Sequence, residues 1–428
     1  MVIGLLARVI MFVVFYPAAS TFPNSGGFYK MASHLVNFSF ENYDGKRSPG
    51  YPLLMIMGFL RLKLIVIIQF VLGSIGALFQ YKILLNLKFN KKTSFCIILL
   101  MQSILSVFFY ETSILVESFA FFLMTVVLYL ITKPKYENNK SYKTEFFIGA
   151  ILGLMVLVKP FFAYLPFLIY GLFTLKSFSL RNLINKKLIL LLFPLLFYFG
   201  WSYVNKITTG YFVSTTYLGL NLTQNCVYFA EKAPEEFQWI SQPYAKYRDK
   251  TIAEERDVAM SIWNAYGEGH VFDKYGLTFP EFTHELGKYA KATIKANPLE
   301  YAKQVIFRSW VDFWKPCIRW NPELFRFTWA KKIFMQIWQV QKNILCGLYF
   351  VFGAIFLFSC IVAVYKRKIT LIFILSTMVV VPSFLQAMVT YGTNSQYSYP
   401  FEFMIIFVIA LFIKNRGVLP KKNKIIDN

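Results

Sequence analysis

Lys46-Arg47-Ser48-Pro49-Gly50-Tyr51-Pro52 closes a polar stretch, residues 21–52, that separates two long apolar segments. This stretch carries the first acidic residues of the chain, Glu41 and Asp44. Several apolar segments reach or approach the roughly 20 residues that cross a bilayer as a helix. The alternation predicts a membrane protein in which the first polar stretch forms a structured loop.

The composition supports the same class. Apolar residues make up 57% of the 428 residues and charged residues only 16%, whereas a soluble domain carries about 25% charged residues. A membrane β-barrel would instead show short segments of alternating hydrophobicity. The sequence therefore predicts an all-α polytopic membrane protein, with residues 2–20 retained as its first span.

The net charge of +23 is concentrated beside the apolar segments. Twenty of the 45 basic residues fall in five clusters, at 82–92, 133–143, 176–187, 366–368 and 414–424. Lys and Arg gather in cytoplasmic loops of membrane proteins, where anionic headgroups attract them. This placement predicts membrane lipids, and no nucleic acid, as the partner of the basic residues.

Placing every cluster in the cytoplasm predicts ten transmembrane helices and an inside amino terminus. The predicted spans are residues 2–20, 63–85, 95–109, 115–132, 146–158, 161–175, 188–204, 344–365, 369–389 and 399–413. They define an amino-terminal transmembrane module (1–206), an outer-face region (207–338) and a carboxy-terminal module with a basic cytoplasmic tail (339–428).

Outside the spans, the sequence predicts short helices. In the first outer loop, 21–62, residues 27–38 and 52–60 are expected to lie along the membrane surface. In the outer-face region, residues 250–266 and 280–296 have helical patterns.

Several short motifs follow one another on the predicted outer side. They are Asn24-Ser25-Gly26-Gly27-Phe28-Tyr29, Arg47-Ser48-Pro49-Gly50-Tyr51-Pro52, Glu117-Ser118-Phe119, Gly153-Leu154 followed by Leu157 and Lys159-Pro160, Asn297-Pro298 with Tyr301, and Tyr397 with Pro400. Their order and sidedness resemble the GT-C superfamily of membrane glycosyltransferases. The resemblance is greatest to bacterial relatives of protein O-mannosyltransferases and of the lipid A aminoarabinose transferase.

The resemblance implies an enzyme of the bacterial inner membrane with its active site on the outer face. Such an enzyme transfers a sugar, with inversion, from a polyprenyl-phosphate carrier to a glycan, lipid or protein acceptor. No P-loop and no GxGxxG at a strand–helix turn is present, so no nucleotide-binding motif contradicts this reading. The identity of the sugar and acceptor, and the help of a divalent metal, stay open.

The catalytic base is the point where the chain departs from the resemblance. Family members carry an Asp where this sequence has Asn24, and an amide cannot act as a general base. The base is then another outer-face acid (Asp44, Glu41, Glu111 or Glu117), or the alignment is shifted, or the chain is inactive. We favour another acid, with Glu111 and Glu117 near the outer ends of spans, where ionisable residues are usually functional.

Candidate substrate-binding residues follow from the need to hold a phosphate. Lys159 is expected at the outer tip of a hairpin, and Arg47 offers a guanidinium fork suited to phosphate. Tyr51, Gln396 and Tyr397 complete the candidate site, with Gln396 at a position where family members often have Arg.

Two other functions stay open at this point: a transporter or flippase of lipid-linked glycans, and an inactive GT-C-like scaffold. Cys226 and Cys317 both fall in the outer-face region, where an oxidising compartment would allow a disulfide. The cysteine and histidine spacing predicts no zinc site.

Overall fold

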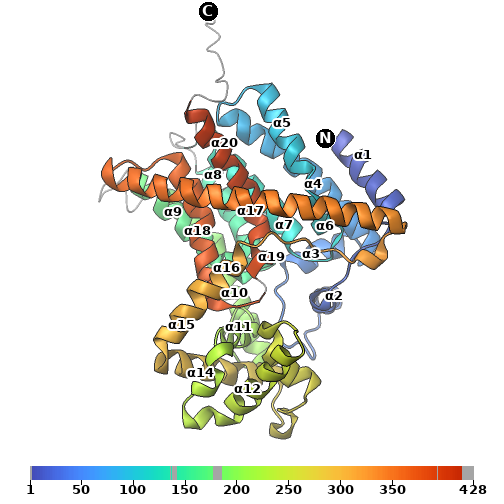
Figure 1. Cartoon of the computed structure of the whole chain (residues 1–428), viewed down its shortest axis with the longest axis vertical. Helices are drawn as coiled ribbons and strands as arrows, with labels where there is room; N and C mark the ends of the chain where they lie inside the picture. Colours follow the sequence, from blue (N-terminus) through green and yellow to red (C-terminus); the bar gives the residue numbers. More distant parts are fainter. Residues whose placement is uncertain (1, 135, 137–141, 177–185, 393, 417–428) are drawn as a thin grey trace, which may run out of the picture.

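A computed structural model describes residues 2–134, 136, 142–176, 186–392 and 394–416. Over these residues the regular secondary structure is helical. Ser20 and Ser113 form an isolated β-bridge. The helices form two bodies, an apolar bundle and a smaller cap (Figure 1). The prediction of an all-α protein is confirmed.

The apolar bundle has one continuous core. The bundle contains α1 (Val2–Ile10), η1 (Met11–Phe15), α4 (Leu62–Asn86), α5 (Lys91–Gln102), α6 (Leu105–Thr112), α7 (Glu117–Ile131), α8 (Lys143–Val158), η2 (Pro160–Tyr164), α9 (Leu165–Lys176), η4 (Lys186–Leu191), α10 (Leu192–Thr209), α17 (Thr328–Tyr365), α18 (Leu371–Val389), α19 (Asn394–Ser398), η12 (Tyr399–Phe401) and α20 (Glu402–Asn415). Its buried side chains are mostly Phe, Tyr, Leu and Ile.

Each predicted span coincides with a helical segment, but the segments differ in length. Five are long and apolar enough to cross a membrane: Leu62–Asn86, Lys187–Thr209, Thr328–Tyr365, Leu371–Val389 and Asn394–Asn415. The pair α5 and α6, bent by 56°, would be a sixth. The remaining four segments fall short of this length, so the prediction of ten full-length spans exceeds what the described residues support.

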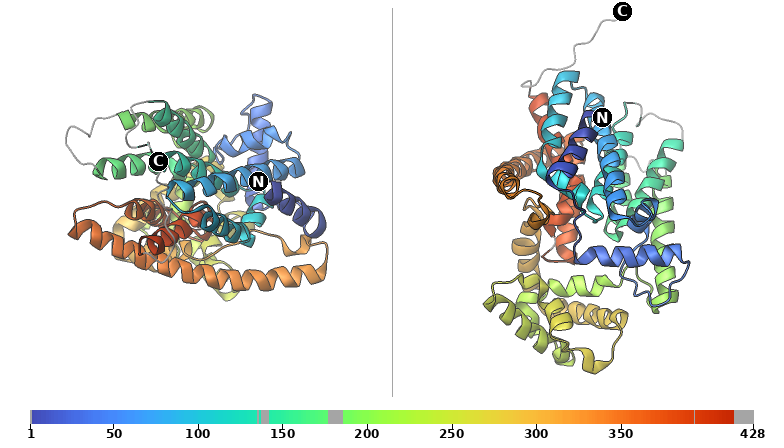
Figure 2. Two further views of the ribbon diagram at one scale, coloured as in Figure 1. Left: turned by 90° about the horizontal axis from the view of Figure 1, so that it is seen from above. Right: turned by 90° about the vertical axis from the view of Figure 1, so that its right-hand side faces the viewer.

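Helix α17 departs most from its predicted span. It begins at Thr328 instead of residue 344 and runs for 38 residues. It lies across the other bundle helices (Figure 1). The right-hand view of Figure 2, turned by 90° about the vertical axis, shows it end-on. Tyr349 and Phe352 face the core, while Phe350 and Ile361 are exposed. An apolar outward face of this kind is suited to lipid contact.

Two short helices of the first loop lie beside the bundle. They are α2 (Pro23–Val36) and α3 (Gly50–Met57), close to the two surface helices predicted for this loop. Gly50 permits a tight contact, because a Cβ there would collide with the backbone of Leu157 and Val158. The loop is thereby fixed against the last turn of α8.

The cap, residues 211–304, has a core of its own around Phe229, Tyr244, Phe282 and Tyr289. Its elements are α11 (Tyr217–Gln224), η5 (Val227–Lys232), η6 (Glu235–Phe237), α12 (Gln238–Ala253), η7 (Val258–Met260), α13 (Ser261–Trp263), η8 (Asn264–Glu268), η9 (Asp273–Tyr275), α14 (Phe279–Ala296) and α15 (Pro298–Gln304). The helix predicted at 280–296 is confirmed. The one predicted at 250–266 is wrong, since the chain turns at Glu255 with a φ of 52°.

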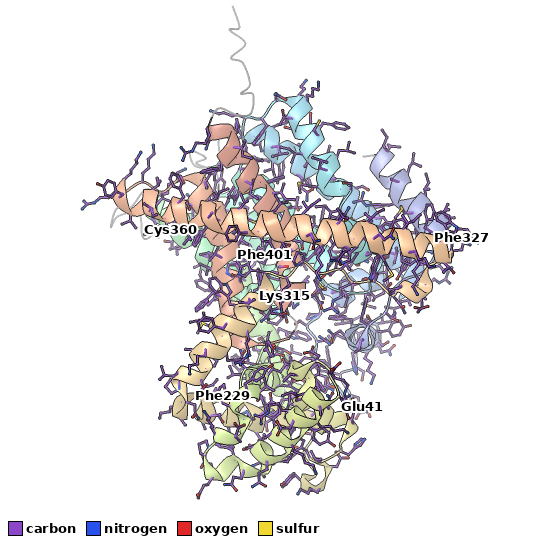
Figure 3. All side chains as sticks on the ribbon, viewed as in Figure 1. Glu41, Phe229, Lys315, Phe327, Cys360 and Phe401 are labelled. Atoms are coloured by element: carbon purple, nitrogen blue, oxygen red, sulfur yellow. The ribbon has the colours of Figure 1, made fainter. Side chains whose placement is uncertain are left out.

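The cap is joined to the bundle through α15, η10 (Val305–Ser309) and α16 (Trp310–Phe313), and then through a segment that contains η11 (Pro322–Leu324). Lys315 lies at this junction, and Glu41 of the first loop lies beside the cap (Figure 3). Hydrogen bonds from the hydroxyl groups of Thr215 and Thr216 to the carbonyl oxygens of Lys46 and Asp44 link the loop to the cap. Cys226 and Cys317 are both free thiols.

Candidate functional site

Lys159 and Glu117 form an ion pair at the end of the bundle nearest the cap. Glu117 is the first residue of α7, and Lys159 follows the last residue of α8. Because Pro160 disfavours a helical residue before it, Lys159 takes an extended conformation (φ −156°, ψ 117°). Its Nζ then lies 3.1 Å from Oε1 of Glu117. Two residues that the sequence predicted separately are therefore in contact.

The second carboxylate oxygen of Glu117, Oε2, is buried and has no hydrogen-bond partner among the described residues. Glu117 as a whole is 1% exposed. A buried charged oxygen without a partner is costly, so this oxygen would readily accept a hydrogen bond from a donor group that reaches it. A small pocket adjoins it that is too narrow for a water molecule as the side chains stand, and its lining residues are Val116, Glu117, Ala120, Lys159, Phe162, Tyr397 and Pro400.

Tyr397 holds the other side of the lysine. The Nζ of Lys159 lies 3.3 Å from the centre of the Tyr397 ring, which attracts a cation. Tyr397 also packs edge-on against Phe161, with the ring centres 5.4 Å apart. The lysine is thus held between a carboxylate and an aromatic ring.

A larger cavity of about 520 Å³ begins at the same lysine and tyrosine. Its walls come from η2, α9, α10, α18 and the start of the cap up to α11, and they are mainly apolar and aromatic, with Tyr164, Phe167, Phe199 and Leu385 among them. Polar groups line part of it: Ser214, Thr215, Asn221 and Gln386. The cavity is therefore amphiphilic.

Two large apolar side chains that line the cavity are about half exposed. Phe167 is 50% exposed and Phe199 is 52% exposed. The cavity therefore offers accessible apolar surface, which is suited to an apolar ligand.

Arg47 lies in the first loop, between two aromatic rings. Its guanidinium carbon is 4.6 Å from the Phe28 ring centre and 4.9 Å from that of Tyr217. Its Nη2 donates to Oδ1 of Asn24 at 2.6 Å, and its buried Nε has no hydrogen-bond partner in the part of the chain that is described. Arg47 is held in place but lines neither cavity.

The other loop candidates are engaged locally. Asp44 forms an ion pair of 2.6 Å with Lys46, and its side chain is 39% exposed. Asn24 is exposed and accepts the hydrogen bond from Arg47. Neither of them lines the two cavities, and their proposed chemical roles stay predictions.

Tyr51 and Gln396 are buried outside the two cavities. The hydroxyl of Tyr51 donates to Oε1 of Gln69 at 3.1 Å, and the hydroxyl of Ser118 donates to the same oxygen at 2.9 Å. This arrangement joins α3, α4 and α7 next to Glu117. Tyr51 therefore helps to position α7, which carries Glu117. Direct substrate contact by Tyr51 or by Gln396 stays a prediction.

Glu111, the other carboxylate near a span end, pairs with Arg8. The Nε and Nη2 of Arg8 donate to its two oxygens at 2.5 and 2.9 Å, and Nη2 also donates to Gln102 at 2.6 Å. Neither cavity includes Glu111. With both oxygens engaged by Arg8 and neither cavity beside it, the geometry argues against Glu111 as the base.

Arg319 is a second cation near Glu117 that sequence reasoning missed. Its segment is held by the hydroxyl of Ser113, which donates to the Arg319 carbonyl at 2.8 Å. Burial lowers the pKa of the Arg319 guanidinium, but Cys317, Tyr110 and Glu117 more than offset this and leave the pKa raised. No motif surrounds Arg319 in the sequence, and only the fold brings it close to Glu117.

Comparison of the chain with models of protein families, with curated proteins and with solved structures gives no match. The described residues also contain no group of three or more His, Cys, Asp or Glu placed to hold a metal ion. Glu117, Lys159 and the cavities beside them are therefore the features of the described residues that bear on function.

Proposed function

We propose that the chain is a membrane glycosyltransferase that takes a sugar from a polyprenyl-phosphate carrier. The observation that carries the proposal is an amphiphilic cavity of about 520 Å³ with Lys159 at its edge. An isoprenoid phosphate has the matching shape: an apolar chain that ends in an anion. A lysine ammonium is a common point-charge partner for phosphate.

The proposed reaction uses one cation and one carboxylate. The acceptor hydroxyl oxygen attacks the anomeric carbon of the sugar, and the bond from that carbon to the phosphate oxygen breaks. The electron pair leaves with the lipid phosphate, beside Lys159. Oε2 of Glu117 takes the proton of the acceptor hydroxyl, in the role of general base. Attack opposite to the leaving phosphate inverts the anomeric centre.

Glu117 supports this role better than the other candidate acids. It adjoins the small pocket, and its Oε2 has no partner among the described residues. Asp44 pairs with Lys46, and both oxygens of Glu111 pair with Arg8. The acceptor, a glycan, lipid or protein, would approach from the side of the cap and the first loop, where Arg47 lies.

One observation favours a second candidate, an inactive scaffold that binds the lipid without transferring sugar. Asn24 occupies the position expected for the base, and Arg47 holds it at 2.6 Å. An amide in this place cannot accept a proton. This candidate shares lipid binding with the main proposal and differs only in turnover.

The test uses purified protein in lipid nanodiscs with a panel of polyprenyl-phosphate sugars. Active protein releases free polyprenyl phosphate, measured by mass spectrometry, when an envelope lipid extract supplies the acceptor. We expect Glu117→Gln and Lys159→Ala to lower the release by at least about a hundredfold, the lower range of acid–base contributions. Lys206→Ala is the matched control. Lys206 is an exposed lysine near the carboxy-terminal end of α10, and it does not line either cavity.

The outcomes separate the two candidates. Binding of undecaprenyl phosphate without turnover of any donor, together with turnover gained on Asn24→Asp, supports the scaffold. Absence of both binding and turnover rejects both candidates.

A further inference from the structure

Lys159 serves two parts of the site at once. Its ammonium contacts the Glu117 carboxylate and the Tyr397 ring, and the same residue lines both the small pocket and the large cavity. If a phosphate binds at the edge of the large cavity, it competes with Glu117 for this ammonium. A lysine can serve either partner, because its charge sits on a flexible four-carbon stem.

Removing Lys159 from Glu117 would leave a buried carboxylate, which is strongly unfavourable without another cation. Arg319 can meet this need. Its carbonyl accepts a hydrogen bond of 2.8 Å from Ser113, four positions before Glu117, and its charge is attracted by Glu117, although the two form no ion pair among the described residues. Its buried Nε lacks a hydrogen-bond partner among the described residues. The resting site thus holds a second cation that interacts with the Tyr110 hydroxyl and keeps its Nε–H unpaired.

We propose that the donor phosphate draws Lys159 away from Glu117, and that Arg319 then takes over as the counter-ion of Glu117. The inference rests on the proposed function and adds a switch to it. In the resting site, Lys159 is hydrogen-bonded to the Glu117 carboxylate. In the donor-bound site, Glu117 has lost this hydrogen bond but stays ionised, because Arg319 is beside it. Glu117 is then ready for the acceptor only after the donor is in place.

A double-mutant cycle with undecaprenyl phosphate tests the exchange. The dissociation constant is measured in nanodiscs for the wild type, Glu117→Gln, Lys159→Met and the double variant. Glu117→Gln removes the competitor for Lys159, so binding should tighten roughly tenfold, within the range of measured couplings. In the Lys159→Met background the same change should alter binding by no more than about twofold.

Equal tightening in both backgrounds would show simple repulsion between Glu117 and the phosphate, and would overturn the exchange. Unchanged binding on Glu117→Gln would overturn it as well. If the wild type does not bind undecaprenyl phosphate at all, the proposed function is rejected instead. Failure of the exchange and failure of the proposed function are therefore distinguishable.

The role of Arg319 is tested by measuring the protons that the protein takes up when the lipid binds. If Arg319 had only a structural role, replacing it would not cause such uptake. In Arg319→Gln, the departure of Lys159 leaves Glu117 without a cation, so the carboxylate should take up a proton as the lipid binds. Among the described residues, the phenols Tyr51, Tyr110 and Tyr399 also respond to the charge of Glu117, but a phenol cannot replace a cation.

Calorimetry at pH 8 in buffers of different ionisation enthalpy measures this uptake. At pH 8 the phosphate is already a dianion, since its second pKa is about 6. We expect uptake in Arg319→Gln, and none in the wild type, in Arg319→Lys or in Arg319→Gln combined with Glu117→Gln. Absence of uptake in Arg319→Gln would overturn the exchange. This measurement also stands if Lys159→Met fails to fold.

Discussion

The bundle contains two buried pairs of a carboxylate and a cation, and their surroundings differ. In the Arg8–Glu111 pair, the side chains are 8% and 4% exposed and both carboxylate oxygens accept hydrogen bonds. In the Lys159–Glu117 pair, the lysine is 20% exposed and one carboxylate oxygen has no partner among the described residues. The first pair is enclosed by helices, and the second borders two cavities.

The contrast shows that burial of a charge does not by itself identify an active site. Glu111 and Glu117 look alike in the sequence, since each lies near the predicted outer end of a span. Satisfied hydrogen bonds and close packing suit Glu111 to a structural role that joins α1 to α6. An unpaired oxygen, and a partner lysine that lines the large cavity, suit Glu117 to a chemical role.

The largest expected effect is on stability, from Arg8→Ala. This change leaves the Glu111 carboxylate buried without its cation, which typically costs about 3–5 kcal/mol. We expect a large drop in the thermal unfolding temperature in detergent. Arg8→Met combined with Glu111→Leu should recover most of the loss, because an apolar pair can replace a buried ion pair. No loss of stability in Arg8→Ala would contradict the structural role.

The next effect comes from two glycines, one beside each pair. A Cβ at Gly73 would collide with the Glu111 carboxylate, and a Cβ at Gly50 would collide with the backbone just before Lys159. Overpacking costs typically about 1–3 kcal/mol, so both Gly→Ala variants should unfold at lower temperature. Only Gly50→Ala should also weaken undecaprenyl phosphate binding, because it displaces Lys159. Equal binding defects in both variants would remove the distinction between the pairs.

At the Lys159–Glu117 pair we expect a loss of lipid binding together with a smaller loss of stability than at the Arg8–Glu111 pair. Lys159→Ala should weaken binding of undecaprenyl phosphate at least roughly tenfold, as loss of a charge-assisted hydrogen bond of about 1.5–3 kcal/mol implies. Its unfolding temperature should fall less than that of Arg8→Ala, because solvent reaches the lysine. A binding assay and a melting curve on the same preparation measure both. A greater loss of stability in Lys159→Ala than in Arg8→Ala would reverse the assignment.

The smallest effect should come from filling the large cavity. Ala163 lines it, and Ala163→Trp should weaken lipid binding a few-fold by occupying space, with little change in the unfolding temperature. Leu196→Trp is the matched control, since Leu196 is 58% exposed on α10 and does not line the cavity. Equal effects of the two tryptophans would argue against the cavity as the lipid site.

Hydrophobic patterning was sufficient to predict where the helices lie but not how long they are. Lys63–Leu85 was predicted as a span, and α4 runs from Leu62 to Asn86. The bend of 56° between α5 and α6 was not predictable, because Ser103 and Ile104 carry no helix-breaking signal. The crosswise course of α17 depends on its packing against the bundle, which no local pattern encodes.

The candidate site was predicted in part. Lys159 and Glu117 were chosen separately, from a hairpin tip and a span end, and the fold brings them together. The pairing of Arg8 with Glu111 could not be foreseen, since 103 residues separate them. Arg319 lies in a segment without regular helix or motif, so only the tertiary structure reveals that it is near Glu117.

Photo-crosslinking tests the central claim most directly. An undecaprenyl phosphate analogue with a photoreactive group in the isoprenoid chain near the phosphate is bound to the protein in nanodiscs, crosslinked and mapped by mass spectrometry. The account predicts labelled peptides from η2, α9, α10 and α18, competed away by unmodified undecaprenyl phosphate and much reduced in Lys159→Ala. Labelling confined to the exposed face of α17, or unchanged by competitor and by Lys159→Ala, would contradict it.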